Sequence, residues 1–204
     1  MKSDFADQIE TAVKEIESQS AAEVVVCLHD SSSNYRDLDL LWSALFAMVV
    51  LGYKIWSPHQ FHPDWIPINV LFCALLGFFL SHSFSGLRRL FLTSRRRDRE
   101  VLRTARSEFT RLGVGRTRGR TGLLIYLSRF ERSLVLLPDV GVEEKIVSGL
   151  WDEWRARYGS ASSERELLNN LEQLLQALKG PLKRQLPRHK DDVNELPDSL
   201  VESE

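Results

Sequence analysis

The chain has 204 residues and a formal net charge of -1, and 43% of its residues are hydrophobic. Its length allows one compact domain of ordinary size beside a membrane segment. Two cysteines, Cys27 and Cys73, are too few for a disulfide framework and suit a reducing compartment. The polar opening MKSDFADQIE lacks the apolar core of a secretory signal peptide, so we expect no cleaved signal.

Residues 1–30 predict a helix followed by a strand. Apolar residues recur at spacings of three and four from Phe5 to Ile16, which is typical of a helix with one apolar face. The run EVVVCL at residues 23–28 is apolar almost throughout and rich in β-branched residues, as in a central strand buried on both faces. The segment DSSSN at residues 30–34 then interrupts the regular pattern.

Residues 31–94 predict a transmembrane hairpin inserted into the domain. Its two apolar stretches, about 38–56 and 65–83, each approach the roughly 20 residues that a helix needs to cross a bilayer. Neither has a charged residue near its middle, and tryptophans stand near the ends, where aromatic residues favour the membrane interface. The alternative is a buried helical pair of a soluble domain, but such helices usually carry a polar stripe.

The flanking charges predict the orientation of the hairpin. The connector at residues 57–64 contains no Lys or Arg, whereas residues 86–120 contain twelve Arg. Loops next to membrane spans that are rich in Lys and Arg stay on the cytoplasmic side. We therefore expect two spans with both termini cytoplasmic, and we expect arginines next to the second span to contact lipid headgroups: Arg88, Arg89, Arg95, Arg96 and Arg97.

The remaining chain predicts further helices and a β-hairpin at residues 95–180. An amphipathic pattern covers 95–112 and ends at Gly113, and two short apolar strands follow at 121–128 and 133–137. A helix is expected from Val142, and another from Ser163, where Ser163 and Glu166 have capping-box spacing. Residues 181–204 contain few apolar residues and predict a disordered tail.

Several of these segments together resemble the TPM domain family. The matching segments are SAAEVVV, an arginine-bearing helix, RTGLLIYLSRFERSLVLLPDVGVEEKI and a Trp-bearing helix, with the hairpin as an insertion. The resemblance implies an α/β fold with a small mixed sheet flanked by helices. The family includes many bacterial membrane proteins, so it also implies the bacterial inner membrane as the location.

Some TPM members are described as acid phosphatases or bind divalent metal through clustered carboxylates, so the resemblance implies Glu23 and Asp139 as metal ligands. Ca²⁺ or another divalent cation would be the cofactor, although Ca²⁺ usually takes six to eight oxygen ligands and few are present. Alternatively, Asp139 caps the following helix and Glu23 pairs with an arginine such as Arg120.

Other catalytic patterns are absent from the sequence. The five histidines show no metalloprotease spacing, and there is no P-loop or dinucleotide fingerprint. Cys27 has no partner nearby in the sequence and is expected to be a small buried residue.

Three functions remain: a non-enzymatic interaction or assembly factor for a membrane complex, a metal-dependent phosphatase, and an anionic-lipid-responsive module. The expected partners are membrane lipid and a membrane protein rather than nucleic acid, and no pattern specifies an oligomeric state.

Overall fold

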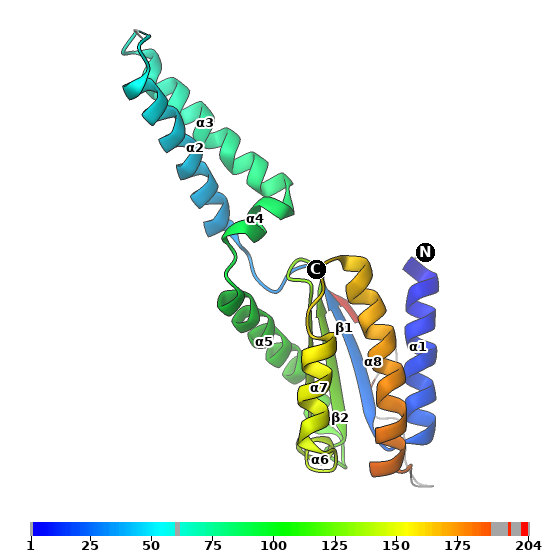
Figure 1. The fold of residues 1–204 in the computed structure, drawn as a ribbon. Coiled ribbons are helices and arrows are strands. Elements are labelled where there is room, and N and C mark those ends of the chain that lie inside the picture. The colour runs from blue at the N-terminus through cyan, green and yellow to red at the C-terminus, as the bar shows by residue number, and fades with distance from the viewer. Residues whose placement is uncertain (1, 60–61, 189–195, 197–200, 204) are drawn as a thin grey trace. The chain divides into compact units, whose positions relative to one another are not determined.

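The structure is a computed structural model that describes residues 2–59, 62–188, 196 and 201–203. The chain divides into two compact units, one containing residues 1–33 and 98–204 and the other residues 34–97. We call the first the α/β unit and the second the hairpin unit (Figure 1). The hairpin unit spans nearly the same residues as the insertion predicted at 31–94.

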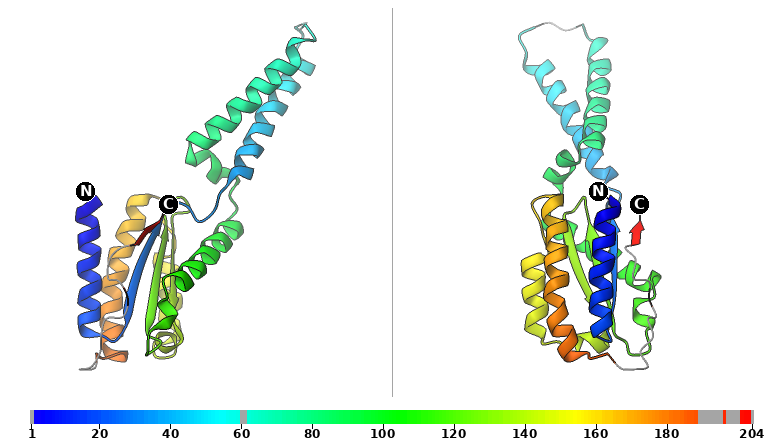
Figure 2. Two further views of the ribbon diagram at one scale, coloured as in Figure 1. Left: turned by 180° about the vertical axis from the view of Figure 1, so that it is seen from behind. Right: turned by 90° about the vertical axis from the view of Figure 1, so that its right-hand side faces the viewer.

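The α/β unit is built on a mixed sheet with the strand order β3-β2-β1-β4. β1 (Glu23–His29) pairs in parallel with β2 (Gly122–Ser128), although the hairpin unit separates them in the sequence. β2 pairs antiparallel with β3 (Ser133–Pro138) to form the expected β-hairpin. This small mixed sheet with helices on both faces confirms the predicted fold class (Figure 2).

One face of the sheet packs against three helices. These are α1 (Lys2–Gln19), α7 (Ser148–Tyr158) and α8 (Glu164–Gln185). Successive strand residues point to opposite faces, so every second residue of β1 and β2 contributes to this main core. The strand side chains on this face are Val24, Val26, Leu28, Leu123, Ile125, Leu127, Leu134 and Leu136.

The opposite face is covered by α5 (Ser94–Arg111), with the short 3₁₀ helix η1 (Val114–Arg116) following it. Val101 and Ala105 of α5 pack here with Val25, Cys27 and Tyr126 of the strands. Because both faces are covered, every residue of β1 and β2 is buried. This burial explains the uninterrupted apolar runs that predicted the two strands.

The carboxyl-terminal segment differs from the predicted disordered tail. α8 does not end before Pro181 but continues to Gln185, because Leu182 and Leu186 extend its apolar stripe into the main core. A fourth strand, β4 (Val201–Ser203), then pairs in parallel with β1. Residues 189–195, 197–200 and 204 of the expected tail lie outside the described residues.

The helix expected from Val142 is two helices in the structure. α6 (Val140–Glu143) is one turn long, and α7 starts only after an extended Val147 with φ -54° and ψ 126°. On either side of this break, Ile146 and three residues of α7, Trp151, Trp154 and Tyr158, are buried in the main core. A single periodic pattern in the sequence does not reveal such a break.

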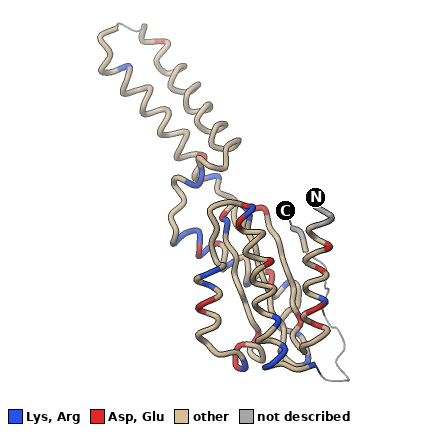
Figure 3. The backbone as a smooth tube through the Cα atoms, turned by 45° about the vertical axis from the view of Figure 1, so that its right-hand side comes forward, with Lys and Arg blue, Asp and Glu red and all other residues tan. Residues whose placement is uncertain are grey.

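The hairpin unit contains α2 (Arg36–Trp56), α3 (Trp65–Ser83) and the short α4 (Ser85–Phe91). α2 and α3 are long and apolar enough to cross a membrane, by length and composition. They pack closely at Gly77, where an added Cβ would lie 2.8 Å from the carbonyl oxygen of Trp42. Charged residues are sparse along these two helices and frequent in the α/β unit (Figure 3).

Candidate functional site

A cluster of three chemically reactive side chains lies between β1 and α5. Cys27 and His29 are two residues apart on β1, which places both side chains on the sheet face that α5 covers. Glu108 reaches them from α5. All three residues are buried, and one ligand-type atom from each lies within 4.8 Å of the others. We call this group the Cys-His-Glu centre.

Glu108 stands between the other two members of the Cys-His-Glu centre. Its Oε2 accepts a hydrogen bond from Sγ of Cys27 at 3.8 Å, and its Oε1 lies 3.7 Å from Nε2 of His29. The second distance exceeds hydrogen-bond range. Nε2 of His29 is fully buried and has no hydrogen-bond partner in the described part of the chain.

The electrostatics of the centre keep Cys27 protonated in the absence of a bound group. Burial, and secondarily the charge of Glu108, raise the pKa of the Cys27 thiol to about 12. A thiol with this pKa is a poor nucleophile at neutral pH, because the thiolate is the reactive form. Arg111 donates hydrogen bonds to Oε2 of Glu108, and this contact raises the pKa of the Arg111 guanidinium.

Polar contacts beside the centre fix the segment that leaves β1. The ring of Tyr126 lies 5.2 Å from that of His29, and its hydroxyl is 3.0 Å from Oγ of Ser32. The backbone N–H of Ser32 donates to Glu131 at 3.0 Å, while its carbonyl accepts from Thr104 of α5 at 2.8 Å. The centre therefore lies at the carboxyl ends of two parallel strands, where ligands of open α/β sheets usually bind.

The two carboxylates implied by the family resemblance occupy the other end of these strands. Both oxygens of Asp139 accept hydrogen bonds from Arg120, at 2.7 and 2.8 Å, and Oδ1 also accepts the N–H of Val140 at 2.9 Å. Asp139 is thus the N-cap of α6, as the alternative interpretation predicted. Asp139 accepts from Nε and Nη2 of Arg120 in a bidentate pair, and the suggested pairing of Glu23 with an arginine stays a prediction.

Glu23 and Asp139 stand on either side of β2. Glu23 is buried opposite Gly122 in the β1–β2 register, and the N–H of Asp139 donates to the carbonyl of the same Gly122 from the other side. Their backbones are therefore two strand spacings apart, or about 10 Å. A cation between them would also have to displace Arg120 from Asp139.

The arginines expected at lipid headgroups have several different environments. Arg88 binds Asp39 in a bidentate pair and Arg96 binds Asp37, whereas Arg95 is exposed. Arg89 and Arg97 are half-buried. At least two of the five guanidinium groups, those of Arg88 and Arg96, therefore make contacts inside the hairpin unit.

The Asp39 carboxylate holds the base of the hairpin unit together. Its side chain is fully buried, and it accepts hydrogen bonds from Nε and Nη2 of Arg88, both at 2.7 Å, and from Oγ of Ser81 at 2.7 Å. The indole N–H of Trp42 donates to the carbonyl of Leu87 at 2.9 Å. These contacts join α2, α3 and α4 through satisfied polar groups.

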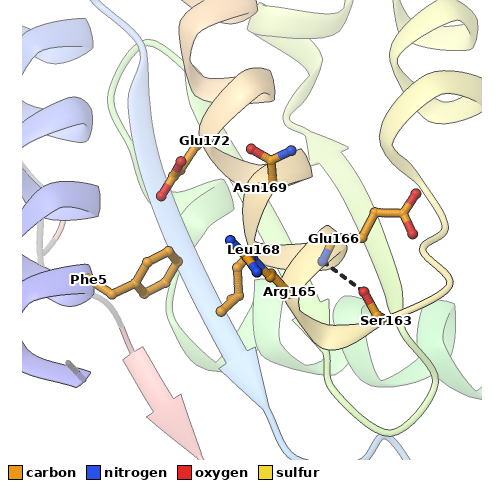
Figure 4. A pocket seen from close by; sticks show the side chains of 7 residues that line it. All are labelled: Phe5, Ser163, Arg165, Glu166, Leu168, Asn169 and Glu172. Carbon is orange, nitrogen blue, oxygen red and sulfur yellow. Dashed lines mark hydrogen bonds between the residues drawn. The ribbon is translucent and has the colours of Figure 1, made fainter.

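A surface groove runs along the seam between α1 and α8. Figure 4 shows its larger hollow, of about 620 Å³, with Phe5 of α1 projecting toward the residues of α8. Ser163 caps α8 by accepting the N–H of Glu166, and the Glu166 carboxylate accepts mainly from Ser162 and more weakly from the backbone N–H of the cap residue Ser163. A second hollow of about 340 Å³ continues the groove and shares Glu172 with the first.

The Cys-His-Glu centre is not predictable from sequence patterns, because Glu108 lies 81 residues from Cys27 in the chain. The available signal was the alternate spacing of Cys27 and His29 on a strand, which places them on one face. Glu108 follows them by about 80 residues, and its acidic side chain stands within an apolar helix stripe. Only the pairing of β1 with β2 and the packing of α5 bring the three together.

No family model and no curated protein matches the chain. Its fold is similar to that of the BA42 protein from the psychrophilic bacterium Bizionia argentinensis, determined by NMR. The two structures align with a TM-score of 0.53 and 15% sequence identity, over 98% of this chain and 94% of that chain. At this level of identity the similarity establishes a shared fold.

Proposed function

We propose that the protein is a membrane-anchored, TPM-like domain that acts as a non-enzymatic interaction factor in the assembly or maintenance of a membrane complex. The observation that carries the proposal is the apolar surface of the hairpin unit. Large apolar side chains point outward from α2, α3 and α4. Soluble proteins rarely expose contiguous apolar surface of this extent, whereas lipid removes the penalty of exposing it.

The interior of the hairpin unit supports the same conclusion. Gly77 lets α2 and α3 approach closely, as small residues do in membrane helix pairs. The buried Asp39 is fully hydrogen-bonded, which low-dielectric surroundings require of a polar group. On α4, Leu90 and Phe91 are exposed beside Arg88 and Arg89, a composition typical of a helix at the membrane interface.

The proposed orientation places both termini in the cytoplasm of a bacterium, with only the connector outside. It rests on the absence of Lys and Arg from residues 57–64 and on the arginines that follow α3. Because the hairpin starts and ends on one side, the two sequence segments of the α/β unit remain in the same compartment and form one sheet.

The α1–α8 groove is the proposed contact surface for a membrane-protein partner. It has partly exposed apolar groups, Phe5 and Leu168, surrounded by charged and amide side chains. This combination is typical of protein interfaces, which have an apolar centre and a polar rim.

Photo-crosslinking in native membranes tests the interaction. A photoreactive residue at Asn169, in the groove, should give a discrete protein adduct, whereas the same residue at the exposed Glu153 of α7 should not. If both positions are unreactive while the purified chain hydrolyses a phosphate ester in a manner dependent on Asp139 and a divalent ion, the phosphatase alternative replaces the proposal. Adducts only with anionic lipid would favour the lipid-responsive alternative.

Cysteine labelling tests the anchor and its orientation. In a Cys73→Ser background, an impermeant maleimide added outside intact cells should label His59→Cys in the connector and leave Glu153→Cys unlabelled. Cys27 is buried and should remain protected. Labelling of Glu153→Cys alone would reverse the orientation, and extraction of the protein by alkaline carbonate would refute the anchor.

A further inference from the structure

We propose that Cys27, His29 and Glu108 bind one divalent transition-metal ion, with Zn²⁺ as the ion that fits best. This metal site is independent of the proposed interaction function and of the carboxylates Glu23 and Asp139. It would join β1 to α5, the strand and the helix that flank the hairpin unit in the sequence.

The donor chemistry selects the class of ion. One thiolate, one imidazole and one carboxylate are the ligand types that Zn²⁺ takes in proteins. Ca²⁺ and Mg²⁺ prefer oxygen ligands alone, and Glu108 is the single oxygen donor in this group. The centre therefore suits a borderline-soft cation rather than the hard cation expected at Glu23 and Asp139.

The spacing of the three donors also agrees with zinc. Bonds of 2.0 to 2.3 Å in tetrahedral geometry place neighbouring ligand atoms about 3.5 Å apart. Here Sγ of Cys27 and Nε2 of His29 lie 3.8 and 3.7 Å from oxygens of Glu108. A small rotation of the Glu108 side chain would direct one oxygen toward the shared centre.

A second, independent observation is the state of the imidazole. His29 is 6% exposed, and its buried Nε2 points toward Glu108 without a hydrogen bond in the described residues. A buried polar atom without a partner is destabilising, so native proteins rarely retain one without a reason. A metal ion between Nε2 and the carboxylate would satisfy both groups.

Two features of the centre must change when the ion binds. The Cys27 thiol releases its proton to solvent, and the resulting thiolate forms the bond to the metal. Arg111, which now neutralises Glu108, must move away from the cation; its side chain is half-exposed and can turn toward water. With three protein ligands, the fourth position of the ion is left for water.

Cobalt substitution of the purified full-length chain tests the site. After treatment with a chelator, one equivalent of Co²⁺ should produce the near-ultraviolet absorption of a thiolate–cobalt bond, and Zn²⁺ should remove it by displacement. Cys27→Ser should lose this absorption completely, and His29→Gln should weaken binding at least about tenfold. Cys73→Ser is the matched control and should behave as wild type, because Cys73 lies on α3.

The same titration contains the outcomes that overturn the proposal. They are no thiolate band in wild type, a band that persists in Cys27→Ser, or a band that Cys73→Ser abolishes. Asp139→Ala should leave the titration unchanged, so loss of binding in that variant would assign the metal to the other end of the strands. If Cys27→Ser does not fold, alkylation of Cys27 in the Cys73→Ser chain decides: Zn²⁺ should slow it at least about tenfold, and an unchanged rate refutes the site.

Discussion

The hairpin unit and the α/β unit distribute polar and apolar residues in opposite ways. In the α/β unit, leucines such as Leu174 are fully buried and charged groups lie mostly outside. In the hairpin unit, Leu71 and Met48 point outward while Asp39 is fully buried. The first arrangement suits water, which penalises exposed apolar surface, and the second suits the proposed lipid environment, which penalises unpaired polar groups.

Each unit also contains an Asp–Arg ion pair with two hydrogen bonds, and the two pairs differ in burial. Asp39 and Asp139 each accept two hydrogen bonds from one arginine. Arg88 is mostly buried with Asp39, whereas the Arg120 side chain is 58% exposed. Burial strengthens a charge pair and also increases the penalty of breaking it. Removing one partner should therefore cost more stability at the buried pair than at the exposed one.

Removing the buried carboxylate should have the largest effect. Asp39→Ala leaves Arg88 uncompensated at the base of the hairpin, and breaking a buried pair costs about 3–5 kcal/mol. Reversible unfolding of the full-length chain in mixed micelles measures this loss. The control Asp37→Ala removes an exposed pair with Arg96 and should cost about 1 kcal/mol or less; equal effects would show that burial does not distinguish the two pairs.

Truncating one leucine in each unit tests whether apolar side chains are buried in the α/β unit and face outward in the hairpin unit. Leu174→Ala should destabilise the α/β unit by about 2–5 kcal/mol, because it leaves a cavity in the main core. Leu71→Ala should change the free energy of unfolding in micelles by about 0.5 kcal/mol or less, since its side chain faces outward. Circular dichroism and intrinsic fluorescence during denaturation follow both variants. A large effect of Leu71→Ala would indicate that α3 packs against protein there.

Helix contact within the hairpin should be sensitive to a single methyl group. Gly77→Ala places a Cβ 2.8 Å from the Trp42 carbonyl oxygen, so the helices must separate, at about 1–3 kcal/mol. Gly52→Ala is the control, because its added Cβ would meet only Trp56 at 3.4 Å. Disulfide trapping between cysteines introduced on α2 and α3 would report the separation. Unchanged trapping in Gly77→Ala would contradict the close packing.

The smallest expected effect is a change in the acid sensitivity of the α/β unit. Hydrogen bonds from the Ser162 hydroxyl and N–H lower the pKa of Glu166 below its ordinary value of 4.5. A lowered folded-state pKa contributes stability that is present above pH 4.5 and lost as the pH falls below it. Melting curves of Glu166→Gln should therefore show a shallower decline in acid than those of wild type. If wild type and Glu166→Gln lose stability equally in acid, the contribution of the Glu166 hydrogen bonds is contradicted.

Local patterns were sufficient for several elements of the α/β unit and for the two apolar helices. Uninterrupted apolar runs identified β1 and β2, and the helical period of 3.6 identified α5 and α8, because both patterns depend on near neighbours in the sequence. The apolar length of α2 and α3 and the arginines beside them follow from the same one-dimensional information. The cap at Asp139 was also predicted, because a cap involves residues adjacent in the chain.

Tertiary packing decided the contacts between distant residues. Cys27, His29 and Glu108 converge only because β1 lies beside β2 and α5 covers that face. The choice of Arg120 as the partner of Asp139 depends likewise on where β3 ends. The extension of α8 through Pro181 depends on a core that accepts Leu182 and Leu186. Periodicity specifies which face of an element is apolar, whereas the neighbour of that face is specified only when the whole chain packs.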